Sequence, residues 1–257
     1  MGKTDKRSQA LLELLAERET LSVNEISAEF HISLPTVRKM CAALEAEGRI
    51  LRIRGGVKRL PEPPNYSFNK FTQEHIEEKR RIGRYAASLL ESNKTVFFET
   101  GTTVLQCAIA FAECLRNSEL TNVIVFTNSL INLEALHPVC NVHFVGGRYR
   151  DERKDFTGYM SELALKGLHF DYCIIGADAI SLTGGVMGMD IETVRFDREL
   201  VSKSGQVIIL AHSDKLYRNS LITFASLEDT AYIVTDAHLE DAVYDQYIKK
   251  GIRLIRV

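Results

Sequence analysis

The hydrophobic pattern of residues 21–58 predicts two short helices followed by a β-hairpin. Val23, Ile26 and Phe30 lie on one face of the first helix, because positions three and seven apart share a side. Ser33 is placed to cap the second helix. The expected buried stripe of that second helix consists of Val37, Met40, Ala43 and Leu44. Basic and apolar residues then alternate around a Gly-Gly pair, which is typical of the wing of a winged helix-turn-helix.

A further amphipathic helix is expected over residues 7–17, so that three helices and a wing make one small domain. In a helix-turn-helix, the N-terminal part of the second helix of the motif enters the major groove of DNA. The DNA contacts predicted from this arrangement are Ser33, Thr36, Arg38 and Lys39 on the helix, and Arg52, Arg54 and Lys58 on the wing. A small helical domain with a solvated basic face is one alternative, which the agreement of turn, cap, apolar stripe and basic wing disfavours. A winged helix used only for protein contacts is another, which the basic wing disfavours.

Three prolines within residues 60–66 predict a stiff linker, because proline interrupts regular structure. We therefore expect a DNA-binding domain over residues 1–59, a linker over residues 60–71 and a second domain over residues 72–257.

From residue 72 onward, short β-rich runs alternate with helical runs. Helices are expected over residues 72–90, 104–116, 131–136, 161–167, 191–204 and 239–249. Strands are expected over residues 95–98, 123–127, 142–145, 172–176, 207–211, 232–235 and 252–256. This alternation predicts a mainly parallel sheet covered by helices on both faces, with ligands bound at the carboxyl ends of its strands.

The charge is unevenly distributed, although the whole chain carries a net charge of only -2. Residues 1–60 hold eleven Lys/Arg and eight Asp/Glu, whereas the remainder holds 21 and 26. A basic end joined to a neutral or acidic body favours double-stranded DNA as the partner of the first domain.

The five cysteines have no CxxC spacing, which is typical of reduced thiols in a cytoplasmic protein and not of a zinc site or disulfide framework. The seven histidines show no ligand spacing, so we expect no bound metal. No signal peptide and no apolar run of 18 residues is found, and we expect no membrane association.

Five predicted strands end in polar, glycine-containing or cationic loops. A Gly/Thr turn at the start of a helix offers free backbone N–H groups to an anion. Together these loops predict a concave site for a small, anionic, hydroxylated ligand. Its candidate residues are Glu99, Gly101, Thr102, Thr103, Asn128, Ser129, Gly147, Arg148, Asp178, Glu192 and Lys215.

Several of these segments, in this order, resemble the DeoR family of bacterial transcriptional regulators. The resemblance is carried by the recognition-helix and wing segment 36–57, by HIEEK at 75–79, by ETGTT at 99–103, by TNS at 127–129 and by HSDK at 212–215. It implies an N-terminal winged helix-turn-helix domain followed by a mainly parallel α/β domain like ribose-5-phosphate isomerase. It also implies a regulator, expected to be a repressor, that binds operator DNA and senses a phosphorylated sugar, with no other cofactor.

A sugar-phosphate isomerase fused to a DNA-binding module is the alternative. The isomerase loop is similar to residues 175–179, but Ile175 and Ala179 occupy positions where the enzymes hold carboxylates. General base catalysis needs a positioned ionisable group, and only Asp178 remains in this loop. We therefore expect a binding site with no catalytic residue, in a homodimer or homotetramer with two DNA half-sites.

Overall fold

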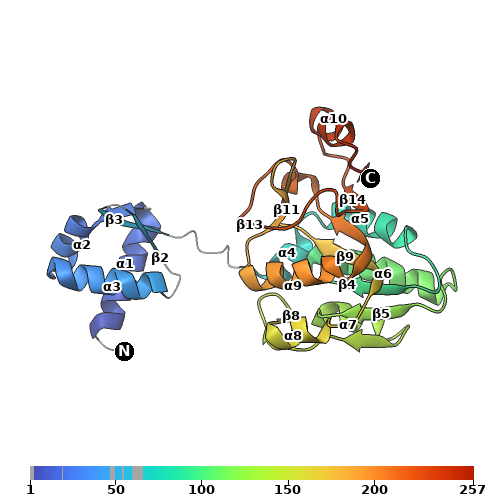
Figure 1. The fold of residues 1–257 in the computed structure, drawn as a ribbon, viewed down its shortest axis with the longest axis horizontal. Helices are drawn as coiled ribbons and strands as arrows, with labels where there is room; N and C mark the ends of the chain where they lie inside the picture. Colours follow the sequence, from blue (N-terminus) through green and yellow to red (C-terminus); the bar gives the residue numbers. More distant parts are fainter. Residues whose placement is uncertain (1–2, 19, 47–49, 54, 60–65) are drawn as a thin grey trace. The chain divides into compact units, whose positions relative to one another are not determined.

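The computed structural model describes residues 3–18, 20–46, 50–53, 55–59 and 66–257. Contacts between residues divide the chain into two compact units, Met1–Asn65 and Tyr66–Val257, whose helices and strands are drawn in Figure 1. Among the described residues, no helix is both long and apolar enough to cross a membrane.

The first unit is a winged helix-turn-helix. Its elements are α1 (Lys3–Arg18), β1 (Thr20–Ser22), α2 (Val23–Phe30), α3 (Leu34–Ala46), β2 (Ile50–Ile53) and β3 (Gly56–Arg59). The three strands form an antiparallel sheet in the order β1-β3-β2. Leu11, Leu15, Ile26 and Leu44 are almost fully buried and form the core against which the helices pack. The predicted hairpin therefore gains a third strand, β1, that the sequence pattern does not indicate.

Local hydrogen bonds and backbone geometry fix the start and the end of α2, which leads into the turn before α3. The Ser22 hydroxyl accepts the Glu25 N–H at 3.1 Å, and the Glu25 carboxylate accepts the Ser22 N–H at 2.7 Å, so a capping box starts α2. His31 has a φ of 49° and ends α2 in the left-handed region. The stripe of α3 is buried except at Ala43, which is exposed; Cys41, only 2% exposed, takes its place in the core.

The second unit is built on a seven-stranded sheet with the order β15-β14-β12-β9-β4-β5-β6, and every neighbouring pair is parallel. The strands are β4 (Thr95–Phe98), β5 (Ile124–Thr127), β6 (Val142–Phe144), β9 (Phe170–Gly176), β12 (Ser204–Leu210), β14 (Tyr232–Thr235) and β15 (Leu254–Arg256). The mainly parallel α/β fold predicted from the sequence is therefore confirmed.

Helices cover both faces of this sheet. Successive side chains of a strand point to opposite sides, so neighbouring residues of one strand pack against different helices. Phe98 packs against Phe111 of α6, with ring centroids 5.2 Å apart, whereas its neighbour Phe97 packs against Phe196 of α9 at 5.8 Å. The helical elements are α4 (Phe68–Gln73), α5 (Ile76–Ser88), α6 (Thr102–Arg116), α7 (Leu130–Leu136), α8 (Tyr159–Ala164), α9 (Ile191–Ser202), the 3-10 turn η1 (Ser213–Lys215) and α10 (Asp241–Lys249).

Five short strands of the second unit lie outside the predicted pattern. They form a hairpin of β7 (Arg148–Arg150) and β8 (Asp155–Thr157), and a small antiparallel sheet of β10 (Ala179–Ser181), β11 (Gly185–Gly188) and β13 (Ile222–Ala225). Runs of three or four residues, several of them beside glycines, are too short for periodicity to identify.

The segment from Tyr66 to Phe71 differs most from its prediction as part of a linker. Phe68 is 3% exposed, and its N–H donates to the carbonyl of Glu152 at 2.8 Å, so this segment is folded onto the second unit. The prolines of the predicted linker, within residues 60–65, lie outside the described residues. The predicted helix over 72–90 is interrupted at His75, whose φ of 53° separates α4 from α5.

Candidate functional site

The start of α3 presents a polar, basic surface. Thr36, Arg38 and Lys39 are exposed, while their neighbours in the sequence Val37 and Met40 are buried in the core of the unit. The Ser33 hydroxyl lies 2.9 Å from that of Thr36. This is the face that a recognition helix turns toward the major groove.

The wing residues are less uniform than the sequence suggests. Lys58 is exposed, whereas the Arg52 guanidinium lies 3.5 Å from a carboxylate oxygen of Glu45 on α3. The Arg52 N–H also donates to that carboxylate at 3.2 Å. Arg52 therefore ties the wing to α3, and a phosphate would have to compete with Glu45 for it. Arg54 lies outside the described residues.

The second candidate site lies where the direction of the sheet's strand order reverses. The chain passes from β4 to β5 and β6 on one side, and from β9 to β12, β14 and β15 on the other. The helices that follow β4 and β9 pack on opposite faces, as the two cores show. Open α/β sheets bind ligands in the crevice at such a switch point, outside the carboxyl ends of the strands.

The loop after β4 has the form of an anion site. Gly101 has a φ of 150° and precedes α6, and a Cβ there would lie 3.3 Å from the Val104 side chain. Thr102 and Thr103, each 9% exposed, form the first turn of α6. The first N–H groups of a helix lack partners within it and carry the positive end of the helix dipole.

Lys79 is a candidate residue that the sequence analysis did not single out. It is 7% exposed, and its Nζ donates to the carbonyl of Phe71 at 2.5 Å. Burial and, to a smaller extent, the positive charge of Lys215 lower the pKa of Lys79 to about 8, although the carboxylates of Glu74 and Glu78 act in the opposite direction. The signal in the sequence is a lysine spaced three residues from both Ile76 and Ile82, on the apolar stripe of α5.

The topology places Lys79 near the start of α6. Helix α5 leads into the amino end of β4 and α6 leaves its carboxyl end, so both helices begin at the carboxyl edge of the sheet. They touch at Gly83, where a Cβ would lie 2.5 Å from the carbonyl carbon of Gln106. Lys79 and Thr102 each precede this contact by one helical turn. Lys215, in η1 after β12, supplies a second ammonium group near Lys79.

Polar atoms without partners lie buried at the same edge. Glu99 is 3% exposed, and its Oε1 has no hydrogen-bond partner among the described residues. Burial raises the pKa of Glu99 well above its ordinary value, and the nearby charges of Asp197 and Asp155 raise it further. The Oδ1 atom of Asn128, after β5, is likewise buried without a described partner, although its amide donates to the Phe156 carbonyl at 3.2 Å.

The structure gives other predicted ligand residues a different task. Ser129 is fully buried, and its hydroxyl accepts the Asn132 N–H at 3.4 Å, so it is the N-cap of α7 and not an open ligand group. Gly147 is required because a Cβ would collide with the Ser161 hydroxyl and the Thr157 carbonyl. This close packing alone explains the glycine at position 147, without the expected approach of a ligand.

Arg148 and Glu192, both predicted to contact the ligand, form an exposed ion pair with each other. Asp178 is partly exposed, and its Oδ2 accepts the Met189 N–H at 2.9 Å, which fixes the loop after β9. Each of these three side chains already has a protein partner.

One cluster bears on the expectation that no metal is bound. Ligand atoms of His75, His212 and Asp214 all lie within 4.8 Å of one another. Burial lowers the pKa of His212, and the charges of His75 and Lys215 lower it too. The donor set suits a divalent cation, but the ammonium of Lys215 opposes a second positive charge at this place.

Comparisons with known proteins agree with the two units. Residues 7–62 match the family model described as the DeoR-like helix-turn-helix domain, and residues 74–237 match that of the DeoR C terminal sensor domain. The chain is 27% identical to the HTH-type transcriptional regulator IolR of Bacillus subtilis (strain 168) over 253 residues, which cover 96% of this chain and 98% of that protein. It is 29% identical to the lactose phosphotransferase system repressor of Staphylococcus epidermidis over 242 residues, which cover 92% and 93%.

Among solved structures, ribose 5-phosphate isomerase from Plasmodium falciparum is similar with a TM-score of 0.43 and 21% identity, over 56% of this chain and 54% of the enzyme. The chain thus spans about half the length of that enzyme. The assignment rests on the two family models, which between them match both units from residue 7 to residue 237. The chain belongs to the DeoR family of transcriptional regulators.

Proposed function

We propose that this regulator represses a carbohydrate-utilisation operon in the cytoplasm, and that a phosphorylated sugar controls its binding to double-stranded operator DNA. Two relatives that match this chain over nearly their full length are named as a transcriptional regulator and as a lactose phosphotransferase system repressor. The first unit supplies a recognition helix whose exposed start carries Arg38 and Lys39. We further propose that two or four copies act together, because one winged helix reads only one half-site.

The observation that carries the effector proposal is the pairing of two ammonium groups with a helix N-terminus. Lys79 is buried at an energetic cost that an anion would remove, and Lys215 lies near enough to influence its pKa. A phosphate over Thr102 and Thr103 would accept backbone N–H bonds and neutralise both lysines.

The hydroxyl groups of the sugar would meet the buried polar atoms beside this loop. Oε1 of Glu99 and Oδ1 of Asn128 lack partners among the described residues, and an unpaired buried polar atom is costly. A raised pKa favours the protonated form of Glu99, which can donate a hydrogen bond as well as accept one. Asp178 would add a carboxylate from the far side of the crevice.

Binding without turnover is the form of this proposal that the loop after β9 supports. Ile175 is fully buried and Ala179 is 2% exposed, so the positions that correspond to isomerase carboxylates are part of the core. Asp178, the remaining carboxylate of the loop, is engaged by the Met189 N–H. Proton transfer between adjacent carbons needs a base that can reach the substrate.

A thermal-shift panel of sugar phosphates tests the proposal. A ligand that binds only the folded state raises stability by RT ln(1 + [L]/Kd), or about 2.7 kcal/mol at one hundred times Kd. Lys215→Ala should abolish the shift, whereas Lys203→Ala, just before the amino end of the same strand β12, should retain it. No shift with any sugar phosphate would contradict the effector proposal, and turnover of one would revive the enzyme alternative.

A further inference from the structure

Residues 66–71, called the docking segment below, are the first residues of the second unit and follow the first unit directly in the sequence. Phe68 is buried, and the rings of Tyr66 and Phe71 lie 5.4 Å apart. The Phe68 N–H donates to the Glu152 carbonyl in the β7–β8 turn at 2.8 Å. The docking segment thus rests on a turn that the sequence pattern does not indicate.

Arg153 joins this segment to the loop after β4. Its guanidinium lies over the Tyr66 ring, 4.5 Å from the centroid, and its backbone carbonyl accepts the Thr100 hydroxyl at 3.3 Å. Thr100 stands directly before Gly101 and α6, where the phosphate is proposed to bind. A cation over an aromatic face is attracted by the ring, and more strongly where water is excluded.

A second connection runs through Lys79, whose Nζ donates to the Phe71 carbonyl at 2.5 Å. The Phe71 end of the docking segment is therefore held by Lys79 of the proposed anion site, and the Tyr66 end by Arg153, whose carbonyl accepts the Thr100 hydroxyl beside that site. Burial raises the pKa of the Tyr66 phenol, with the carboxyl groups of Glu99, Asp178 and Asp155 adding to the rise. Through Arg153, Tyr66 is connected to the loop at the carboxyl end of β4.

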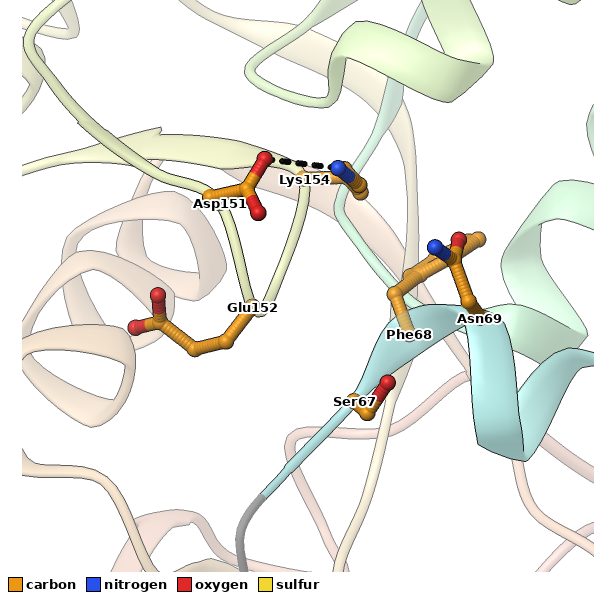
Figure 2. A pocket seen from close by; sticks show the side chains of 6 residues that line it. All are labelled: Ser67, Phe68, Asn69, Asp151, Glu152 and Lys154. Atoms are coloured by element: carbon orange, nitrogen blue, oxygen red, sulfur yellow. Dashed lines mark hydrogen bonds and ion pairs between the residues drawn. The ribbon is translucent and has the colours of Figure 1, made fainter.

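The contact between the docking segment and the turn leaves space beside it. Figure 2 shows an open pocket with Ser67, Phe68 and Asn69 on one side and Asp151, Glu152 and Lys154 on the other. The ion pair of Lys154 with Asp151, at 2.7 Å, lies within the turn and does not cross to the docking segment. The docking segment is held at Tyr66, at the buried Phe68 and at Phe71, and the pocket lies beside it.

We propose that Tyr66 and Arg153 form a latch over the effector site, and that a bound phosphate releases the docking segment by drawing Lys79 away from the Phe71 carbonyl. This inference rests on the proposed function and adds how the occupied site acts on the chain that leads to the DNA-binding unit. An ammonium group forms a stronger hydrogen bond with a phosphate oxygen than with a neutral carbonyl, so the two interactions compete for Lys79. The bound state can alter DNA affinity only through such a difference between two conformations.

The test uses the full chain, inorganic phosphate as the probe, and a DNA fragment that the protein selects from a random duplex pool. Phosphate binding is followed by thermal shift, and DNA affinity by fluorescence anisotropy at constant ionic strength. In the wild type, saturating phosphate should change DNA affinity by about fivefold or more. In Tyr66→Ala and Arg153→Ala, phosphate should still raise the Tm, while DNA affinity should change less than about twofold.

The matched control is Tyr244→Ala, because the Tyr244 ring lies 4.6 Å from the guanidinium of Arg256, away from the docking segment. It removes the same kind of contact and should keep the wild-type response. Tyr66→Phe keeps the ring and should also keep the response, which guards against misfolding of the alanine variant. A wild-type response in Tyr66→Ala or in Arg153→Ala overturns the latch. If neither phosphate nor any sugar phosphate stabilises the wild type, the proposed function fails and the latch fails with it.

Discussion

At the scale of single residues, Lys79 shows how a proposed binding group can oppose folding. Its pKa in the folded protein is about 8, below the 10.5 of a free lysine, because it is buried. A base whose pKa is lowered by folding destabilises the folded state while it is protonated. The cost is fully present below pH 8, and it disappears as the pH rises from about 8 to 10.5.

We expect Lys79→Met to stabilise the protein at pH 7 by about 1–2 kcal/mol, because one pKa unit corresponds to about 1.4 kcal/mol and a hydrogen bond is lost in return. The gain should shrink at pH 10, and phosphate should no longer raise the Tm. Urea unfolding at both pH values measures this. Lys203→Met should change stability by less than about 0.5 kcal/mol at either pH. A variant less stable than the wild type at pH 7 would show that Lys79 supports the fold.

At the scale of elements, the sequence predicts what has long periodicity and fails where elements are short. The strands of the parallel sheet and the helices between them follow from alternating apolar runs. The hairpin of β7 and β8 does not, because its strands have three residues each and Arg150 joins them to a distant segment. Arg150 is 4% exposed and pairs with Asp155 of β8 and with Asp190, the N-cap residue of α9, a contact between distant segments that no local pattern reveals.

Arg150→Leu should cost about 3–5 kcal/mol, because removing one member of a buried ion pair leaves uncompensated charge. The Arg150 guanidinium donates to Asp155 at 2.9 and 2.6 Å and to Asp190 at 2.6 Å. Arg148→Leu is the matched control in the same strand, since its pair with Glu192 is exposed and should contribute less than about 1 kcal/mol. Equal losses in chemical denaturation would contradict this account of the hairpin.

The residues of the candidate ligand site also fall into those that the sequence predicts and those that it does not. The loop after β4 and the lysine in η1 are visible in the sequence because they follow predicted strands directly. Lys79 belongs to the HIEEK segment, but the sequence does not show that its ammonium group lies near the loop after β4, and the pairing of Arg148 with Glu192 depends on how β7 meets α9. Contacts set by tertiary packing of short elements could not be predicted, whereas groups fixed by the order of strand, turn and helix could.

The recognition helix α3 carries the next prediction. Arg38→Ala and Lys39→Ala should each weaken operator binding, by about 1–3 kcal/mol if the side chain contacts a base in bidentate fashion. Electrophoretic mobility shift or anisotropy measures it. Arg18→Ala at the exposed end of α1 removes the same charge from another helix and should have a smaller effect. Unchanged binding in the folded Arg38→Ala, Lys39→Ala double variant would remove α3 from the interface.

At the scale of the whole molecule, we expect an even oligomer held mainly by residues after Tyr66. A single winged helix makes a small interface, and specific affinity at physiological salt usually needs two half-sites. Light scattering at micromolar concentration should give twice or four times the 29.0 kDa of one chain. A monomer both with and without DNA would contradict the expectation.

The proposed regulation requires that ligand binding to one unit changes the DNA affinity of the other. If a sugar phosphate changes operator affinity by some factor, the operator must change the affinity for that sugar phosphate by the same factor. Calorimetric titration of the effector into the free protein and into the protein–operator complex should therefore give dissociation constants that differ by about 5- to 150-fold. A repressor released by its effector must bind it more weakly on the operator, whereas a co-repressed one must bind it more tightly. Equal constants would leave a sensor domain that binds a ligand without regulating DNA.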